Sequence, residues 1–193
     1  MLATAQTCAM LGLDGYIVQA KVDISPGLPA FNIVGLPDTA VQEAKERVRA
    51  ALRNSGCEFP LRRITVNLAP ADLKKEGPAY DLPIAVGMMV SSGQVDLPDE
   101  KAVYLGELSL DGSLRHTTGI LSMISVVRDQ GFTKAYVPAV DAPEAALVEG
   151  VEVFPVPIPD LASLIEHFRG RPESLPFRRT ATTRTKPGPL PKP

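Results

Sequence analysis

The sequence predicts an α/β fold, a two-layer α+β sandwich in which helices pack against a mixed sheet. Three observations support this fold class. Residues 1–35 show the short apolar runs and turns of β-strands, a clear amphipathic helix follows, and strands then alternate with helices as far as residue 168. Such an order of elements buries the apolar faces of helices and sheet in one layered core.

The first 35 residues are expected to form three strands. Alternating apolar and polar residues are typical of a half-buried strand. Asp14-Gly15, inside the turn Leu13-Asp14-Gly15, is a hairpin signal between the first two runs. The expected strands cover residues 3–12, 16–25 and 30–35.

The clearest helix begins at Asp38 or Thr39, either of which can cap it, and stops before Gly56. Glu43 and Arg47 are expected to pair on its solvent-facing side. Its apolar residues recur at helical spacing and predict a buried face made of Val41, Ala44, Val48, Ala51 and Leu52.

A strand over residues 62–70 leads into the stretch KKEGPAYDLPIA (residues 74–85), where a charged run meets a Gly-Pro turn and an apolar helix. That helix is expected over Leu82 to Ser92, with Asp81 as its N-cap and Pro83 tolerated in its first turn. The remaining expected elements are a hairpin turning at Asp111-Gly112, a helix over 121–129, a strand over 135–138, a short helix over 145–150, a strand over 151–157 and a closing helix over 160–168.

Composition divides the chain into a domain and a tail. Residues 1–170 are expected to form one domain, because a 193-residue chain that is 45% hydrophobic and 22% charged suits a single core. Residues 171–193 are expected to be a Pro-rich basic linker or disordered tail. From Arg169 onward, seven Lys or Arg stand against one Glu, a charge of +6, so the preceding 168 residues carry −8. An acidic body limits any contact with DNA to a local patch.

Several kinds of chemistry have no signature. The sequence has no GxxxxGK[ST], GxGxxG, HExxH or GxSxG pattern, so no phosphate loop or metalloprotease site is predicted. Cys8 and Cys57 match no metal-binding or redox pattern, and His116 and His167 have no acidic residue at ligand spacing, so no metal site is expected. With no signal peptide and no apolar run of about 20 residues, we expect a cytoplasmic protein without a membrane span.

Three blocks carry a family resemblance: IVGLPDTAVQEAKERVRAAL (33–52), ITVNLAPADLKKEGPAYDLPIAVGMM (64–89) and LGELSLDGSLR (105–115). In these blocks the chain resembles the N-terminal, ChlI-type domain of the ComM/YifB family of magnesium-chelatase-like AAA+ ATPases. The resemblance implies a fold similar to the Lon proteolytic domain and to domain 2 of ribosomal protein S5, with a left-handed βαβ crossover. That handedness opposes the general preference.

The similarity to Lon makes the Gly-Pro turn informative. Lon-type peptidases place a serine nucleophile after this Gly-Pro and a lysine base at the start of a later helix, and the serine needs that base to become reactive. Here Gly77 and Pro78 are retained, but Ala79 holds the place of the serine and Leu121 that of the lysine. We therefore expect no peptidase activity and a structural role for Gly77, Pro78 and Asp81.

The family resemblance also implies a function. Full-length members join this domain to an AAA+ motor that forms ring hexamers and drives branch migration of DNA in natural transformation. ATP and magnesium belong to that motor, which is absent from this chain, so neither is an expected cofactor here. We expect a non-catalytic domain that assists DNA contact or ring assembly.

The candidate DNA contacts are the basic residues that crowd into residues 45–75. Arg62 and Arg63 precede a strand that Lys74 and Lys75 follow, so the two pairs are expected at opposite strand ends and need not form one patch. Solvated charge at the ends of elements is the alternative interpretation. The full candidate set is Lys45, Arg49, Arg53, Arg62, Arg63, Lys74 and Lys75.

Two other functions remain open. The domain could serve only for oligomerisation. It could also be a degenerate Lon-type peptidase with residual hydrolase activity, in which case Asp81, Glu107 and Asp111 are the only acids near the former dyad. Asp81 is better explained as a helix cap and Asp111 as a turn residue, while Glu107 could be a charge partner within the sheet.

Overall fold

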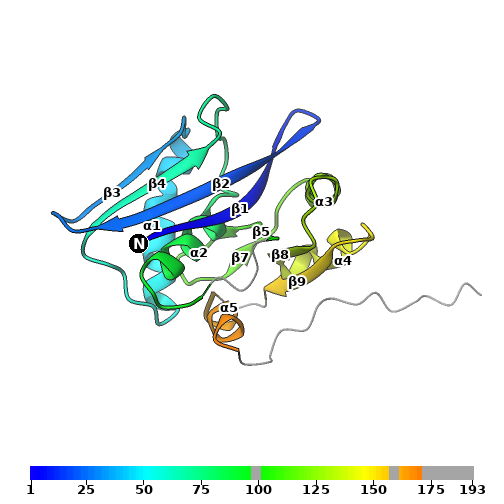
Figure 1. The fold of residues 1–193 in the computed structure, drawn as a ribbon. Coiled ribbons are helices and arrows are strands. Elements are labelled where there is room, and N and C mark those ends of the chain that lie inside the picture. Colours follow the sequence, from blue (N-terminus) through cyan, green and yellow to red (C-terminus); the bar gives the residue numbers. More distant parts are fainter. Residues whose placement is uncertain (97–100, 157–160, 171–193) are drawn as a thin grey trace, which may run out of the picture.

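The computed structural model describes residues 1–96, 101–156 and 161–170, so the predicted tail at 171–193 lies outside the described residues. Seven strands form one sheet in the order β3-β4-β2-β1-β5-β8-β9, and β6 and β7 form a separate two-stranded ladder (Figure 1). The elements are β1 (Leu2–Leu11), β2 (Asp14–Ser25), β3 (Ala30–Val34), α1 (Thr39–Asn54), β4 (Arg63–Ala69), α2 (Asp81–Ser91), β5 (Ala102–Tyr104), β6 (Glu107–Leu108), β7 (Leu114–Arg115), α3 (Ile120–Asp129), β8 (Lys134–Pro138), the 3-10 helix η1 (Ala139–Asp141), α4 (Ala142–Ala145), β9 (Glu152–Val156) and α5 (Leu161–Phe168).

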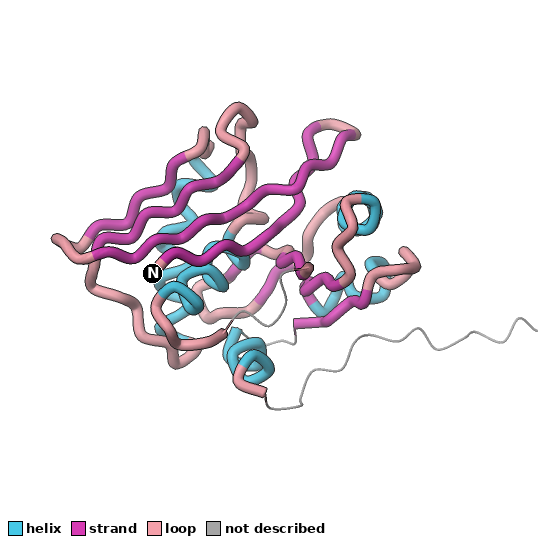
Figure 2. Tube along the Cα trace, in the orientation of Figure 1, coloured by secondary structure: helices cyan, strands magenta, loops and turns pink. Residues whose placement is uncertain are grey.

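The sheet is mixed, as the sequence predicts. β1, β2 and β4 pair antiparallel, whereas β3 pairs with β4 in parallel, and β1, β5, β8 and β9 pair in parallel in that order. The long β1–β2 hairpin is the most extended part of the sheet (Figure 2). The last paired residues of the hairpin are Leu11 and Asp14, so the turn is Gly12-Leu13 and not the expected Leu13-Asp14-Gly15.

Helices cover the two faces of the sheet unequally. Helices α1, α2 and α5 bury their apolar residues in one core against one face. Helices α3 and α4 form a second core on the opposite face, under β5, β8 and β9, where Val103 and Tyr104 point to different sides. The α/β sandwich is thus confirmed, and the structure adds a third layer over one half of the sheet.

Most expected elements are present, with boundaries shifted by one or two residues. The exception is the short helix expected over 145–150, which forms at Ala142–Ala145 instead, with Pro143 in its first turn. Proline suits that position because its missing N–H needs no partner in the first helical turn. No helix in the described part of the chain is long and apolar enough to cross a membrane.

Gly35 explains why the motif VGLPD needs a glycine. Its φ of +102° lies in the left-handed region, and a Cβ at this position would meet the backbone oxygen of Leu68 at 2.1 Å. β3 can therefore end against β4 and turn directly into α1 only with glycine here.

Candidate functional site

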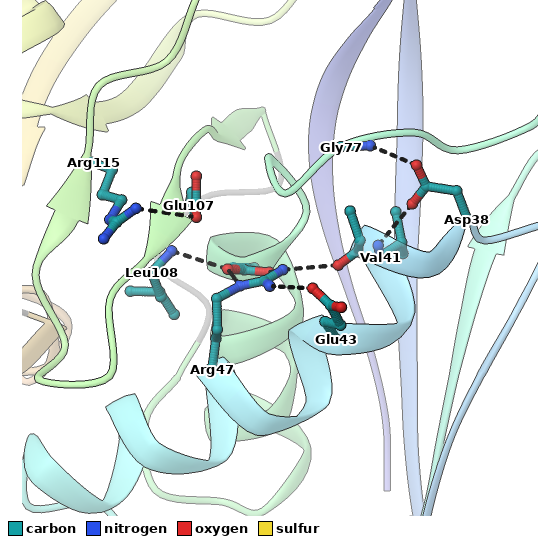
Figure 3. A network of polar contacts seen from close by, with 10 residues as sticks. Asp38, Val41, Glu43, Arg47, Gly77, Glu107, Leu108 and Arg115 are labelled. Carbon is teal, nitrogen blue, oxygen red and sulfur yellow. Dashed lines mark hydrogen bonds and ion pairs between the residues drawn. The ribbon is translucent and has the colours of Figure 1, made fainter.

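The first candidate site is the Gly-Pro corner, residues 74–81, which the sequence places where a Lon peptidase has its nucleophile. Asp38, the last residue of the motif VGLPD, binds this corner through its side chain. One carboxylate oxygen of Asp38 accepts the backbone N–H of Val41 at 2.8 Å and so caps α1, while the other accepts the N–H of Gly77 at 3.2 Å (Figure 3). Asp38, and not Thr39, is thus the cap. One side chain ties the helix start to the Gly-Pro turn.

Lys75 lies inside the corner and not on the surface. Its N–H donates to the carbonyl of Leu36 at 3.0 Å, its carbonyl accepts from the N–H of Asp38 at 2.9 Å, and its ammonium donates to the carbonyl of Pro70. The residue is only 1% exposed, and burial lowers the pKa of its ammonium group. The expectation that Lys75 contacts phosphate is therefore wrong for this conformation.

Asp81 is not a helix cap, contrary to expectation. The N-cap position of α2 is Tyr80, and no side chain caps that end. The Asp81 carboxylate is fully buried and accepts from Nε and Nη2 of Arg47 at 2.6 and 3.1 Å and from the N–H of Leu108 at 3.1 Å. It thereby joins α1, α2 and β6 into one unit.

Arg47 has a second partner that was not expected. Its predicted ion pair with Glu43 is present, at 3.8 Å, but its shorter contact, at 2.6 Å, is with the buried Asp81. Burial raises the pKa of Asp81 to about 6, against the opposing effect of Arg47. The hydrogen bond to Asp81 in turn raises the pKa of Arg47. The guanidinium also donates to the carbonyl of Ala40 at 2.9 Å, so this pair is anchored at both ends.

The two other acids near the positions of the Lon serine and lysine, Glu107 and Asp111, also have structural partners. Glu107 faces Arg115 across the β6–β7 ladder, with a 3.9 Å ion pair. Asp111 accepts the N–H and hydroxyl of Ser113 at 3.0 and 2.7 Å, as a turn residue does. The expectation for Asp111 is confirmed.

Ala79 lies in the turn that precedes α2, and Leu121 lies in the first turn of α3, 39% exposed. Neither side chain can attack a carbonyl or accept a proton. Elsewhere in the described ranges, no group of three or more His, Cys, Asp or Glu side chains is placed to hold a metal ion. His116 lies against Asp141 and His167 against Tyr136, so each histidine has a local partner.

The second candidate site is an arginine cluster, which we define as Arg49 and Arg53 over the ring of Phe59, together with Arg62, which lines the same two cavities as Arg53 and Phe59. Arg49 and Arg53 lie one turn apart near the end of α1, with their guanidinium carbons 5.1 and 5.6 Å from the centre of that ring. Cations over an aromatic ring gain about 0.5–1 kcal/mol at exposed sites, which favours this orientation. The ring itself packs against Phe31, with centres 5.9 Å apart.

The cluster carries charge that its surroundings do not neutralise. Arg49 has an exposed partner, Glu46, at 3.4 Å. Within the described ranges, Arg53 and Arg62 have no ion pair, and both are exposed. Two cavities of about 700 and 240 Å³ open beside the cluster, and both are lined by Arg53, Phe59, Leu61 and Arg62.

The structure separates the remaining basic candidates from one another. Lys45 lies one turn before Arg49 on α1, and Arg63 is exposed at the start of β4. Lys74 follows the other end of β4, where it is paired with Glu76 at 2.9 Å. The expected separation of the two basic pairs is therefore confirmed, while the inclusion of Phe59 was not foreseen. The signal that could have indicated it is an aromatic residue three positions before the Arg62-Arg63 pair.

Comparison with known proteins places this chain in a family. The family model described as "Subunit ChlI of Mg-chelatase" matches residues 20–141. The chain belongs to this family. Within it, the chain is 51% identical over 122 residues to the uncharacterized protein YifB of Salmonella typhimurium, covering 63% of this chain and 24% of that protein. It is 41% identical over 148 residues to competence protein ComM of Haemophilus influenzae, covering 76% of this chain and 29% of that one.

A more distant likeness is to the DNA repair protein RadA of Mycolicibacterium smegmatis, 28% identical over 143 residues, 71% of this chain and 29% of that protein. The chain thus spans less than a third of the length of these relatives. The ComM/YifB resemblance is confirmed at the level of the family. The ChlI match contains both the Gly-Pro corner and the arginine cluster, whereas α5 lies beyond it.

Proposed function

We propose that this chain is the N-terminal, non-catalytic domain of a recombination-associated AAA+ ATPase of the ComM/YifB family and that it contacts DNA through the arginine cluster. In this proposal, ATP and magnesium are bound by a motor outside the chain, and the motor assembles the domain into a ring hexamer. Support comes from the ChlI family and from relatives named as a competence protein and a DNA repair protein.

The observation that carries the proposal is the unpaired charge of Arg53 and Arg62 beside cavities on an otherwise acidic protein. Guanidinium groups bind phosphate oxygens with two parallel hydrogen bonds, so a local group of them is a suitable phosphate contact. An acidic body limits such contacts to local patches of positive charge, and the arginine cluster is one such patch.

A pure oligomerisation module is the second candidate, favoured by apolar side chains at the β3 edge of the sheet. Leu28, Val34 and Leu36 are 87%, 46% and 53% exposed there. Sedimentation of the chain distinguishes the two functions, because stable hexamers with no affinity for DNA would support this alternative. Residual hydrolase activity has less support, because Asp81, Glu107 and Asp111 are each held by structural partners.

The test is DNA binding by the whole chain, measured by fluorescence anisotropy between about 50 and 200 mM salt. Affinity should fall steeply with salt, since neutralised phosphates release counterions. In an Arg53→Gln, Arg62→Gln double variant, the slope of log affinity against log salt should become shallower by about two, roughly one for each lost phosphate contact. Because the basic tail is common to both proteins, the difference between them reports the cluster.

The control is Arg128→Gln, which removes an exposed cation, paired with Asp129, from α3 in the opposite layer. It should leave the slope unchanged. A double variant that stays folded by circular dichroism and binds DNA as the wild type does would remove the cluster from the proposal. A flat salt response of the wild type would remove DNA altogether.

A further inference from the structure

The segment from Phe59 to Arg62 lines both cavities of the arginine cluster. The larger cavity continues toward Ile24, Cys57 and the end of α2, and the smaller one continues toward Pro29 and Phe31. Arg53 and Arg62 line both cavities, so a ligand in either cavity would lie beside them.

The larger cavity has the lining of a site for a flat, partly polar group. Ile24, Cys57 and Leu61 supply apolar surface, and the polar part of the lining comes from Glu58, Ser92 and Gln94. The Gln94 amide bonds the Ser92 hydroxyl and the backbone of Glu58, so these polar groups are fixed in place. A volume of about 700 Å³ is within the range of small-molecule sites. Nucleobases combine apolar faces with hydrogen-bonding edges, so this lining suits a base better than it suits a phosphate alone.

Duplex DNA cannot use these cavities. In a duplex the base faces are stacked on one another, and only phosphates and groove edges reach a protein surface. A single strand can turn its bases outward, and it is recognised by aromatic rings and guanidinium planes on which those bases stack. Phe59 with Arg49 and Arg53 provides such a group in the lining of the smaller cavity.

We infer that the arginine cluster is a single-stranded DNA site, with an unstacked base in the larger cavity and the adjoining phosphate between Arg53 and Arg62. This inference rests on the proposed function, since it specifies which form of DNA the cluster binds. It assigns the cavity lining, and not only the arginines, a role in affinity.

The decisive probe is an abasic strand, which keeps the phosphates and lacks the bases. Three labelled ligands of equal length are compared by anisotropy at one salt concentration: an oligothymidylate, the abasic strand and a duplex. The oligothymidylate should bind about tenfold more tightly than the abasic strand, in line with the contribution of base stacking. The duplex should bind no more tightly than the abasic strand.

Two variants test the cavity itself. Ser92→Leu extends an apolar side chain into the larger cavity and leaves the three arginines in place. It should reduce oligothymidylate affinity to that of the abasic strand and leave abasic binding unchanged. Its matched control is Ser122→Leu, an exposed serine on α3. If Ser92→Leu does not fold, Leu61→Ala replaces it, because Leu61 is 75% exposed and lines both cavities.

Each outcome decides between the proposals. Equal binding of all three ligands would overturn the single-strand inference while leaving DNA contact by the cluster intact. No binding of any ligand at low salt would remove the proposed function as well. Competition by thymidine monophosphate as strong as that by the strand would assign the cavity to a free nucleotide and overturn the inference.

Discussion

The two ends of strand β4 carry basic residues that look alike in the sequence and differ in the fold. At the end that leads to the Gly-Pro corner, Lys75 is buried and Lys74 is paired with Glu76. At the other end, Arg62 is exposed beside Arg53, and neither has an ion pair within the described ranges. Positive charge is used for internal structure at the corner and is left available to a ligand at the cluster.

The reason for the difference lies in the neighbouring motifs. The corner is built where three segments meet, and their backbone groups need partners once water is excluded. Asp38, Lys75 and Asp81 supply those partners. The cluster lies at a helix end beside cavities, where solvent satisfies the guanidinium groups and a ligand can replace it.

The largest effect that tests this comparison is expected from Arg47→Met. The substitution leaves the buried Asp81 carboxylate without its cation, and breaking a buried pair from one side costs about 3–5 kcal/mol. Urea unfolding measures it. Arg49→Met is the matched control, since its pair with Glu46 is exposed and should contribute under about 1 kcal/mol.

A second variant separates the charge from the packing. Adding Asp81→Leu to Arg47→Met removes the uncompensated charge, so part of the lost stability should return, less the cost of leaving the Leu108 N–H without its acceptor. If both proteins were equally unstable, the uncompensated charge would not be the main cause of the loss.

Next in size is Asp38→Ala, which removes the cap of α1 and the acceptor of the Gly77 N–H. Loss of an N-cap costs about 0.5–2 kcal/mol, and the second lost hydrogen bond places this variant at the upper end. Thermal or urea unfolding gives the value. Thr39→Ala should change stability by less than about 0.5 kcal/mol, because Thr39 is the exposed first residue of the helix. A larger loss from Thr39→Ala than from Asp38→Ala would contradict this assignment of the cap.

The pH dependence of stability should show a smaller effect from the corner. Burial raises the pKa of Asp81 from its ordinary 3.8 to about 6, so the folded protein binds a proton more tightly than the unfolded chain. This contribution is fully present below pH 3.8 and is lost as the pH rises through about 6. Between pH 7 and pH 5 it should add about 1 kcal/mol to the unfolding free energy.

Asp81→Asn provides the comparison for the pH prediction, because it keeps the shape of the side chain and cannot titrate. Urea midpoints of both proteins are measured across the same range. The unfolding midpoint of the wild type should rise relative to that of Asp81→Asn as the pH falls. A constant difference would mean that Asp81 titrates alike in folded and unfolded chains.

Much of the fold could be predicted from the sequence because its signals are local. The face of α1 follows from the spacing of Val41, Ala44 and Val48, and the strand pattern of β2 from alternation. The third layer could not be predicted. The face of the sheet that α3 covers depends on its packing against strands distant in the sequence, and not on the apolar spacing within α3.

The sites were predicted less well for the same reason. That Ala79 and Leu121 occupy the positions of the Lon serine and lysine can be read from the sequence alone. The environment of a charged residue cannot be read in the same way. Asp81 stands in the sequence where a helix cap is expected, and its burial depends on contacts with Arg47 and Leu108 from other elements. Phe59 likewise joins the arginines only in three dimensions.

The smallest effect is expected from Lys74→Gln, which tests whether the exposed lysine at the Gly-Pro corner contributes to stability or to DNA binding. Lys74 is exposed, and its hydrogen bond with Glu76 raises its pKa. An exposed pair of this kind contributes little to stability, so the unfolding midpoint should stay where it is. Because Glu76 already neutralises the charge, DNA affinity should change by less than about twofold, whereas Arg53→Gln should lower the salt slope by about one. If Lys74→Gln weakened DNA binding as much as Arg53→Gln, the corner would also face the DNA, and the two ends of β4 would act as one surface.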